Sequence, residues 1–499
     1  MTKRALTYLS VRRDHLVLLS LTAATVAAVA AQGPTRSFRA RTLSRFPRFD
    51  GVLRPCPSDG ARVDAYLAPP PCPPEAPLCR ASSNHCAGLE VLPGGALALS
   101  WFTGYREGWE YTGAALATLP PPGAAWSAAP IVLPGSRVAG FSTQNPVLFY
   151  DARNDTLWVF PTRQPSKQKA ALKDDPVPSQ ETMGELWAMS APNASKASKQ
   201  EAALKDDPVP SQETMGELWA MSAPNVSKAA AAAGGAANHL VWSTLSLFVA
   251  AHGTWGRNSV LNRLDGSWLF PVYNESQKML GHNYEHSLLL VKDAAAPVLP
   301  FDAGSGGTSS SWENIEMRDS AFLVQPSIVR VSPGNPDLRV FYRDRRAEFI
   351  YTATSPDDGA TWTSPVPTTL PNNNAGIHAL VLDSGAMIVV YNDMKGETKG
   401  DLRNVLAVGL SDDGGASWTV KRMLESHPDT EIVGSMEDGS SAPVGGLGPT
   451  TCNCYSYPTA VQTPDDGFIH IAFTYQRRTI KYTRVTERWI RNESGVLCQ

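Results

Sequence analysis

Ser355-Pro-Asp357-Asp-Gly359-Ala-Thr361-Trp362 and, further along, Ser411-Asp-Asp413-Gly-Gly415-Ala-Ser417-Trp418 share the pattern S-x-D-x-G-x-(S/T)-W. Each follows an apolar stretch, 349–354 and 404–410. In such a motif Ser and Asp hydrogen-bond to the backbone of a turn, Gly supplies a positive φ, and Trp packs beneath the turn. Two copies in one chain predict two β-hairpins of the same design.

The chain around these hairpins repeats a larger unit six times. Each unit has a polar opening, an apolar strand, a turn containing Gly, Asp or Asn, and a second strand; third strands are expected at 113–119, 285–291, 348–354, 404–410 and 479–485. Six similar units predict an all-β fold, a six-bladed β-propeller, over a β-sandwich. The units open at Asn84-His-Cys-Ala, Gln144-Asn-Pro, Arg257-Asn-Ser, Gln325-Pro-Ser, Asn374-Ala-Gly and Tyr455-Ser-Tyr.

The first 83 residues precede the repeats. Basic residues, an apolar run to Ala31 and the small residues Ala28-Val-Ala30 predict a cleaved secretory signal peptide over 1–31, with a signal anchor or an organelle transit peptide as alternatives. Residues 32–83, rich in Pro and Cys, are expected to form an extended leader onto a propeller spanning 84–499. The predicted location is therefore secreted or in the endomembrane lumen.

Seven cysteines and five sequons agree with an oxidising, glycosylating compartment. We expect disulfides, with one thiol left over or paired between chains, and a tie from Cys498 to the N-terminal cysteines is possible where the ring closes. The disulfide pairing stays open, since spacing alone does not settle it. The sequons are at Asn154, Asn193, Asn225, Asn274 and Asn492.

A tandem duplication interrupts the second unit. Residues 171–193 return almost unchanged at 203–225, within a predicted insertion at 164–237. Glu185-Leu-Trp-Ala-Met or its twin Glu217-Leu-Trp-Ala-Met is expected to supply the third strand of that blade. Only one copy can fill that position, so the other is either looped out or an error in the gene model.

Composition narrows the function classes. The chain has 499 residues, 42% hydrophobic and 18% charged, with a formal charge of −3. This balance favours a globular protein and does not favour a nucleic-acid partner or a stable membrane span. The histidines show no metal-ligand spacing and are expected mostly in loops or on the surface, and no phosphate-binding Gly loop is present, so no cofactor and no metal are predicted. The oligomeric state stays open.

The two turn motifs are Asp boxes, and with the repeats the chain resembles the sialidase (neuraminidase) superfamily, in its BNR/Asp-box "predicted neuraminidase" branch, over residues 84 to 490. The Asp box is structural in that family. The resemblance implies six blades, three arginines on a substrate carboxylate, a Tyr nucleophile paired with Glu, an Asp acid/base and retention of configuration.

In a propeller, the starts of the first strands and the ends of the second strands meet around the centre. From this placement and the resemblance we predict Tyr455 as nucleophile, although Tyr457 also fits, and Glu110 or Glu107 as acid/base. A blade-packing tyrosine, a solvated loop carboxylate and structural ion pairs are the alternatives. The predicted substrate contacts are Arg257, Arg343, Arg477 (or Arg478), Gln325, Asn392 and Asp393.

One departure from the family bears on the substrate. Where sialidases open the first blade with an Arg-Ile-Pro type motif, this chain has Asn84-His85-Cys86-Ala87. The leading hypothesis is a sialidase-like exo-glycosidase acting on a terminal, acidic sugar of a glycan or glycoconjugate. The alternatives are a catalytically inactive propeller that binds glycan or protein, and an organelle assembly factor. Tyr455 hydrogen-bonded to a carboxylate would favour the enzyme; Tyr455 buried between blades would not.

Overall fold

The computed structural model describes a propeller within the compact unit Phe49–Gln499; of the other unit, Met1–Arg48, only Arg48 is described. The predicted signal peptide and the first copy of the duplication, 171–193, therefore lie outside the described residues. The described ranges are 48–56, 59–68, 70, 83–104, 107–121, 125–127, 130–166, 217–230, 240–249, 253–275, 285–293, 312–396, 403–426, 455–464 and 466–491.

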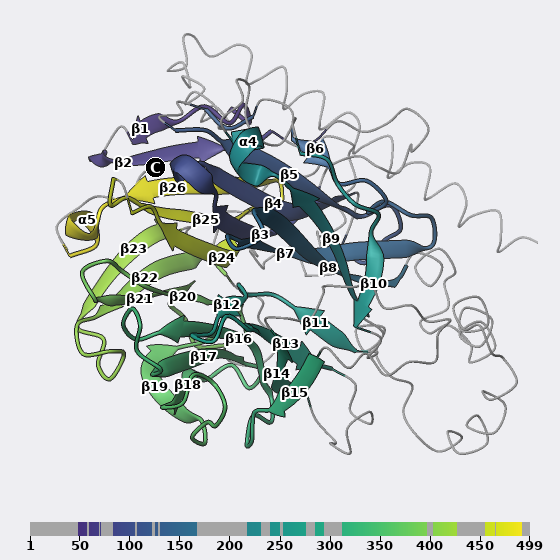
Figure 1. Ribbon diagram of the computed structural model, residues 1–499. Helices are drawn as coiled ribbons and strands as arrows, with labels where there is room; N and C mark the ends of the chain where they lie inside the picture. Colours follow the sequence, from purple (N-terminus) through teal and green to yellow (C-terminus); the bar gives the residue numbers. More distant parts are fainter. Residues whose placement is uncertain are drawn as a thin grey trace, which may run out of the picture. The chain divides into compact units, whose positions relative to one another are not determined.

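Six antiparallel sheets make six blades, as predicted (Figure 1). The first two blades are built from consecutive strands, and a short 3-10 turn, Pro93–Gly95, follows the first strand. Blade 1 contains β3 (Ser83–Val91), β4 (Leu97–Gly104), β5 (Gly113–Leu119) and β6 (Ile131–Val132). Blade 2 contains β7 (Phe141–Asp151), β8 (Thr156–Pro165), β9 (Glu217–Pro224) and β10 (Ser246–Val249), with helix α4 (Val226–Ala230) after β9.

The inner strand of blade 3 is split, because β11 and β12 each pair with a different part of β13. The next two blades are regular four-stranded sheets. Blade 3 contains β11 (Thr254–Gly256), β12 (Leu261–Asn262), β13 (Trp268–Asn274), β14 (His286–Lys292) and β15 (Trp312–Glu316). Blade 4 contains β16 (Leu323–Arg330), β17 (Leu338–Asp344), β18 (Phe349–Ser355) and β19 (Val366–Pro371). Blade 5 contains β20 (His378–Val381), β21 (Met387–Asn392), β22 (Val405–Ser411) and β23 (Val420–Ser426).

Blade 6 joins the two ends of the propeller. Its order is β1 (Arg54–Cys56), β2 (Asp59–Tyr66), β26 (Thr479–Val485), β25 (Ile469–Tyr475) and β24 (Tyr455–Gln462), and helix α5 (Glu487–Arg491) follows β26. Residues 54–56 and 59–66, which we expected in an extended leader, are therefore two strands of the propeller. Pairing of β2 with β26 closes the ring without a loose sheet edge at that junction.

A buried group of four charges lies at this closure. Arg62 and Lys481 are each 1% exposed, and both contact Asp64 and Glu425. Arg62 Nε donates to Asp64 Oδ1 at 2.8 Å, and Lys481 Nζ donates to Glu425 Oε1 at 2.5 Å. We call these four residues the closure cluster. Because Glu425 belongs to β23, the closure cluster joins blade 5 to strands β2 and β26 of blade 6.

The apolar core is divided among the blade interfaces. One cluster contains Val390 and Leu406 of blade 5 with Ile471 of blade 6, and another contains Ala472 of blade 6 with Leu99 of blade 1. Four further clusters join blades 1 and 2, 2 and 3, 3 and 4, and 4 and 5. Each interface thus buries side chains of two neighbouring sheets, which is how a propeller forms a core without a central hydrophobic mass.

Both Asp boxes form the predicted hairpin. Gly359 N donates to Ser355 Oγ at 2.9 Å, and Thr361 N donates to Asp357 Oδ1 at 2.8 Å, with Gly359 at φ +88°. The second box repeats these bonds with Ser411, Asp413, Gly415 and Ser417. Trp362 Nε1 donates to the Gly359 carbonyl at 3.0 Å.

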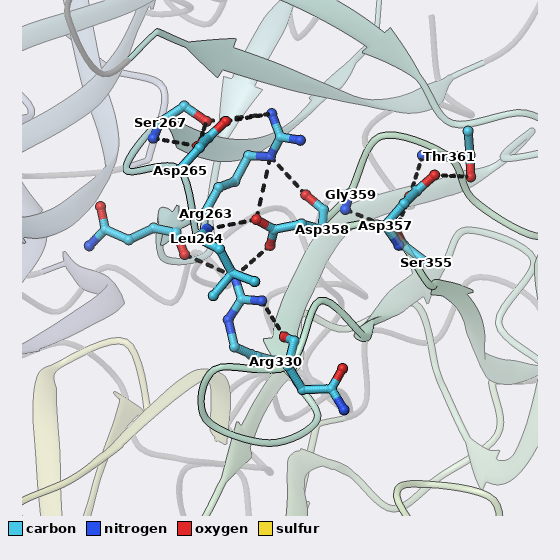
Figure 2. A network of polar contacts seen from close by, with 12 residues as sticks. Arg263, Leu264, Asp265, Ser267, Arg330, Ser355, Asp357, Asp358, Gly359 and Thr361 are labelled. Atoms are coloured by element: carbon cyan, nitrogen blue, oxygen red, sulfur yellow. Dashed lines mark hydrogen bonds and ion pairs between the residues drawn. The ribbon is translucent and has the colours of Figure 1, made fainter.

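The first Asp box also ties blade 4 to blade 3 (Figure 2). Asp358 Oδ2 accepts from the backbone N–H of Leu264 at 2.6 Å, and its Oδ1 accepts from Arg330 Nη2 at 2.6 Å. Arg263 Nε donates to the Asp358 carbonyl at 2.8 Å. The second box has Gly414 at the matching position and so has no side chain for such a bridge.

The second copy of the duplication supplies the third strand of blade 2. Strand β9 contains Glu217-Leu-Trp-Ala-Met and pairs with β8 and β10. After it, Val226 is fully buried, and Ser227 Oγ donates to Asp155 Oδ1 at 2.8 Å. The duplication is nearly exact, but the first copy has Ala194 where the second has Val226.

Two cysteines are described. Cys56 is disulfide-bonded, with its partner outside the described residues, whereas Cys86 is a free, buried thiol. The expected pairing therefore does not include Cys86. Among the helices of the described ranges, none has the length and apolar character that a membrane crossing requires.

Candidate functional site

The inner strands share a backbone distortion that shapes the site. Cys86, Asn145, Gln325 and Tyr457 all have positive φ, between 45° and 62°, and each lies in a β-bulge of β3, β7, β16 or β24. Non-glycine residues rarely adopt this conformation, and bulges re-aim side chains. Blade 5 has a related residue, Asn374, at φ 57° just before β20.

Tyr457 is the centre of a group of arginines. Its hydroxyl oxygen accepts a hydrogen bond from Arg343 Nη1 at 3.2 Å. The guanidinium carbons of Arg403, Arg257 and Arg343 lie 5.2, 5.4 and 5.9 Å from the centre of its ring. We call Tyr457, Arg257, Arg343 and Arg403 the arginine cluster; its three arginines are each 4% exposed, and Tyr457 is half-buried.

Asn374 holds two of these arginines together. Its side-chain Oδ1 accepts from Arg343 Nε at 2.9 Å, and its carbonyl accepts from Arg403 Nη2 at 3.2 Å. The left-handed backbone of Asn374 is itself supported by Asn372, whose Oδ1 accepts from the Asn374 N–H at 3.1 Å. One strained residue thus fixes the spacing of two cations from different blades.

Arg257 binds backbone on either side of Tyr457. Its Nη1 donates to the Ala87 carbonyl at 3.2 Å, and its Nη2 donates to the Pro458 carbonyl at 2.8 Å. It therefore connects blade 3 with the bulges of blades 1 and 6. Both carbonyls are neutral acceptors.

Gln325 and Gly376 complete the surroundings of Tyr457. Gln325 Oε1 accepts from Arg343 Nη1 at 3.2 Å, and its Nε2 donates to the Tyr273 hydroxyl at 3.3 Å. A Cβ at Gly376 would lie 2.9 Å from Tyr457 Cδ1 and 3.0 Å from Gln325 Oε1. Only glycine allows this approach without displacing both side chains.

The electrostatic environment lowers the pKa of Tyr457. Burial opposes ionisation, but the positive charges of Arg343 and Arg403 outweigh it, so the pKa lies below its ordinary value of 10. Most other buried tyrosines show the opposite shift; burial and Glu425, for example, raise the pKa of Tyr455. The arginine cluster therefore favours a negative charge at the Tyr457 hydroxyl.

His85 packs beside Tyr457 as a neutral imidazole. Its ring meets Tyr457 edge-on at 4.5 Å and Phe102 at 5.3 Å between centroids. It is fully buried, and neither ring nitrogen has a hydrogen-bond partner in the described part of the chain. Burial and then the charges of Arg477 and Arg403 hold its pKa well below 6.5. His286 and His378 are also buried, so the expectation of loop or surface histidines was wrong for all three.

The two predicted acid/base candidates have different partners. Glu107 forms an ion pair with Arg477, and its side chain is 35% exposed. Glu110 accepts from the N–H of Gly140 at 2.8 Å and so holds the start of blade 2. Glu107 therefore lies beside the arginine cluster, since Arg477 also acts on His85, whereas Glu110 has a structural contact.

A second ion-pair group flanks the site on the side of blades 3 and 4. Arg345 contacts both Glu275 and Glu285, with Arg345 Nε 2.6 Å from Glu285 Oε2. Glu275 is near enough to Tyr273 to raise its pKa, after the larger effect of burial. This arginine is therefore balanced by two carboxylates.

Tyr455 lies away from the arginine cluster. It is 3% exposed in the apolar interface of blades 5 and 6, with its ring 6.3 Å from Phe473 and 5.6 Å from Tyr475. The geometry that we set as unfavourable for Tyr455 as nucleophile is therefore the one present. The physical reason is the bulge at Tyr457, which turns the two tyrosines of one strand to different surroundings.

Asn392 and Asp393 are not brought to the cluster either. Asn392 is buried and donates to the carbonyls of Val405 and Tyr455 at 2.9 Å each. Asp393 pairs with Lys421 Nζ at 2.7 Å, toward the outer strand of blade 5. Both stabilise the blade. Of the predicted substrate contacts, Arg257, Arg343 and Gln325 meet around Tyr457, and Arg477 is adjacent through Glu107.

Sequence reasoning did not select Arg403 or His85 for the site. Arg403 directly precedes β22, a third strand, whereas only first-strand starts and second-strand ends had been considered. Antiparallel third strands begin where second strands end, so the same topological rule would have included Arg403.

Among the described residues, no three or more His, Cys, Asp or Glu side chains form a group that could hold a metal ion.

Comparison with known families matches a BNR repeat-like domain model to residues 95–471. The chain belongs to the BNR repeat-like domain family. Membership in the BNR repeat-like family agrees with the Asp boxes and the six blades, and the resemblance to the sialidase superfamily is confirmed at the level of fold. The curated proteins contain no match to the chain.

Among solved structures, the BNR repeat-like chain is similar to three sialidase-type proteins. The Hadza microbial sialidase Hz136 has 13% identity and a TM-score of 0.52, covering 82% of this chain and 66% of that one. A mutant of the NanB sialidase from Streptococcus pneumoniae has 12% identity and a TM-score of 0.50, covering 82% and 69%. The intramolecular trans-sialidase from Ruminococcus gnavus, in complex with oseltamivir carboxylate, has 12% identity and a TM-score of 0.50, covering 84% and 97%. At such identities the likeness shows the fold alone.

Proposed function

We propose that this propeller is a sialidase-like glycoside hydrolase that acts on a terminal acidic sugar, with Tyr457 as its nucleophile in place of Tyr455. The observation that carries the proposal is the contact of the Tyr457 hydroxyl with Arg343, inside a group of three buried arginines that lie around the Tyr457 ring. Guanidinium groups bind carboxylates through paired N–H donors. An acidic sugar is therefore the ligand class that this cluster suits.

In the proposed reaction, Arg343 and Arg403 hold the acid group of the sugar near Tyr457. Tyr457 first loses its proton to solvent; its deprotonated Oη then attacks the anomeric carbon and forms a C–O bond while the glycosidic C–O bond breaks, and Glu107 gives its proton to the departing oxygen. Water then attacks the same carbon, the Tyr457 oxygen leaves, and Glu107 takes the proton of the water. Two inversions retain the anomeric configuration.

Glu107 suits this role by position. It follows the second strand of blade 1, its side chain is 35% exposed, and Arg477 holds it. As a carboxylate it can act as the base of the second step. For the first step Glu107 takes a proton from solvent, which its exposure permits.

A second candidate function, a propeller that binds an acidic glycan without cleaving it, is favoured by Gln325. The family resemblance implies a Glu beside the nucleophile, and the side chain that shares Arg343 with Tyr457 is an amide. An amide cannot accept the tyrosine proton at neutral pH. His85, in the place of the first-blade arginine, removes one contact for a carboxylate.

Hydrolysis of a fluorogenic sialoside and of a panel of uronic-acid glycosides tests the proposal. We expect turnover that Tyr457→Phe lowers by roughly 10⁴-fold or more, as for loss of other covalent nucleophiles, and that Tyr455→Phe leaves within about tenfold. Tyr455→Phe is a matched control, since it removes the same atom two residues away. Full turnover by Tyr457→Phe would reject the mechanism. Calorimetric binding of the free acid sugars without turnover would favour the second candidate.

A further inference from the structure

The four bulged inner strands share a second feature besides their positive φ. In each, the residue directly after the positive-φ residue accepts, at its carbonyl, a hydrogen bond from a side chain of another blade. A bulge interrupts the ladder, so a buried carbonyl within it needs a donor from outside the sheet. The four pairs are Ala87 with Arg257 Nη1 (3.2 Å), Pro146 with Ser100 Oγ (2.7 Å), Pro326 with Asn258 Nδ2 (3.1 Å) and Pro458 with Arg257 Nη2 (2.8 Å). Two consecutive residues therefore donate to three of the four bulges.

Blade 3 supplies these two donors because its inner strand is split. Strand β11 ends at Gly256 and β12 begins at Leu261, and each pairs with a different part of β13. Arg257 and Asn258 lie in the interval between them, and both are buried. The interval begins three residues into the inner strand, as does the bulge of β3. Where the other inner strands bulge, blade 3 thus contributes side chains to its partners.

Arg257 reaches blades that are not next to its own. The apolar interfaces place blade 3 between blades 2 and 4, and blade 6 between blades 5 and 1. The carbonyl partners of Arg257 lie in β3 of blade 1 and β24 of blade 6. Burial, and then the charge of Arg257, also lower the pKa of His378 in blade 5 to about 3. One guanidinium therefore spans the middle of the ring.

We propose that Arg257 is a positioning residue: by donating to Ala87 and Pro458 it fixes the bulges of β3 and β24, and so holds Tyr457 in place, rather than binding the substrate itself. Pro458 directly follows Tyr457, so this bond acts on the backbone that carries the tyrosine. The inference rests on the proposed function for the role of Tyr457, and it adds what keeps that tyrosine directed toward Arg343.

The planar fork of an arginine suits this task. Its Nη groups donate in fixed and different directions, so one side chain can hold carbonyls from two strands. A lysine carries the same charge, but its ammonium is a point charge on a flexible stem and is not pre-organised for two fixed acceptors. Arg257→Lys therefore separates the charge of the residue from its geometry.

Amide hydrogen exchange can report on both bulges. The N–H groups of Cys86 and Leu89 in β3, and of Ala460 in β24, each donate to a side chain, at 3.0, 3.3 and 3.3 Å. These amides exchange only when the local structure opens. If Arg257 fixes both bulges, its loss should make both segments open more often, although they belong to different blades.

Hydrogen exchange of the full chain, followed by mass spectrometry, tests the inference without any substrate. In Arg257→Met we expect exchange at residues 86–89 and 457–460 to be roughly 10- to 100-fold faster, the weight of a charged hydrogen bond. Arg257→Lys should speed exchange in at least one of these segments, although it keeps the charge.

Asn258→Leu is the matched control, because it removes a donor to a different bulge at the neighbouring position. Asn258 Nδ2 donates to the carbonyls of Gln325 at 2.8 Å and Pro326 at 3.1 Å. This variant should therefore speed exchange at residues 325–328 and leave residues 86–89 and 457–460 as in wild type.

If a glycoside is turned over, the kinetic constants separate positioning from binding. Arg257→Met should lower kcat, because the nucleophile is no longer held, and should change KM by less than Arg403→Met does. Arg257→Lys should also lower kcat. A rise in KM with unchanged kcat in Arg257→Met would make Arg257 a substrate contact and overturn the inference.

Three exchange results would also overturn it: wild-type exchange in both segments of Arg257→Met, wild-type exchange in both segments of Arg257→Lys, or faster exchange in all blades alike. Thermal unfolding shows whether each variant is folded, and Arg257→Lys carries the test if Arg257→Met is not. Turnover by wild type with unchanged exchange in the variants would reject the inference alone. Faster exchange in both segments, without turnover of any glycoside by wild type, would reject the proposed function alone.

Discussion

The closure cluster and the arginine cluster are both groups of buried charges, but their cations contact different kinds of groups. In the closure cluster, two cations face two carboxylates, and Arg62 and Lys481 are each 1% exposed. In the arginine cluster, three cations lie around a tyrosine and contact two side-chain amides and backbone carbonyls. The closure cluster joins strands from the two ends of the propeller, whereas the arginine cluster gathers its cations around the Tyr457 hydroxyl and ring.

The difference shows two ways in which one fold can keep charged side chains buried. A charge out of water is tolerated when a partner and hydrogen bonds compensate it. In the arginine cluster, the backbone adds other means of holding the charges in place. Here these means are a left-handed asparagine, Asn374, and a glycine, Gly376, which allow two arginines and Tyr457 to approach one another.

The largest expected effect comes from breaking the closure cluster. Arg62→Met leaves Asp64 and Glu425 with Lys481 alone in a buried setting, and should lower the free energy of unfolding by roughly 3–5 kcal/mol. Urea unfolding measures it. Arg54→Met is the control, because Arg54 pairs with Asp50 at the surface and should change stability by at most about 1 kcal/mol. Equal effects of both substitutions would contradict the role of burial.

A substitution in the arginine cluster should act on binding more than on stability. Arg403→Met removes one of three like charges, so we expect the free energy of unfolding to change by less than for Arg62→Met. The dissociation constant for an acidic sugar should rise about 10- to 100-fold, the weight of one charged hydrogen bond. Calorimetry measures this. Unchanged affinity together with a large loss of stability would show that the cluster is structural.

Acid should affect His85, which lies beside the arginine cluster, and Asp64, which belongs to the closure cluster, in different pH ranges. The folded-state pKa of His85 is lowered, so unfolded chains bind more protons and stability falls as pH drops below about 6.5. The pKa of Asp64 is also lowered, through the charges of Lys481 and Arg62 against burial, so its contribution is present above pH 3.8 and is lost only below it. His378 and His470, with pKa values of about 3 and about 4, share the His85 window.

The midpoints of urea unfolding, measured between pH 8 and pH 4, test whether the His85 contribution is lost at higher pH than that of Asp64. His85→Gln should reduce the slope of stability against pH by up to about 1.4 kcal/mol per unit, the effect of one proton. Asp64→Asn should lower stability at every pH in that range and leave the slope unchanged. A slope that His85→Gln does not alter would mean that His85 is not held neutral in the folded state.

The smallest expected effect is that of salt. Raising ionic strength from about 0.1 M to about 1 M shortens the screening length from about 10 Å to about 3 Å. Binding of an acidic sugar should weaken several-fold, because the sugar brings its charge from solvent. The stability difference between wild type and Arg62→Met should stay the same, since that network has no access to salt. A salt-dependent difference would place the closure cluster nearer to water than its exposure indicates.

Sequence and topology predicted the blades well because turns and apolar runs are local signals. The third strands at 113–119 and 479–485 match β5 and β26, and the Asp boxes form as expected. Strands β1 and β2 were not predicted, because β2, which joins them to the sheet, pairs with β26 more than 400 residues away, and Pro-rich sequence surrounds them. Long-range pairing leaves no local pattern.

The site was predicted less completely, for two physical reasons. In a regular strand Tyr455 and Tyr457 would share a face, and only the bulge, with φ 50° at Tyr457, separates them. Nothing in Tyr455-Ser-Tyr457-Pro marks which tyrosine takes that conformation. Arg403, in contrast, was within reach of the topological argument, which had been applied to two strands of each blade and not to the third.

The position of β9 has a consequence at the level of the gene. The 51 residues 166–216 connect β8 to β9, and loss of one 32-residue copy would leave 19. Loop-closure entropy makes the longer connection costlier by only about 0.9 kcal/mol. Because either copy encodes the same strand sequence, unequal recombination between the repeats would shorten or lengthen the connection between β8 and β9 and leave blade 2 intact. Alleles that differ by whole repeats should therefore encode the same propeller.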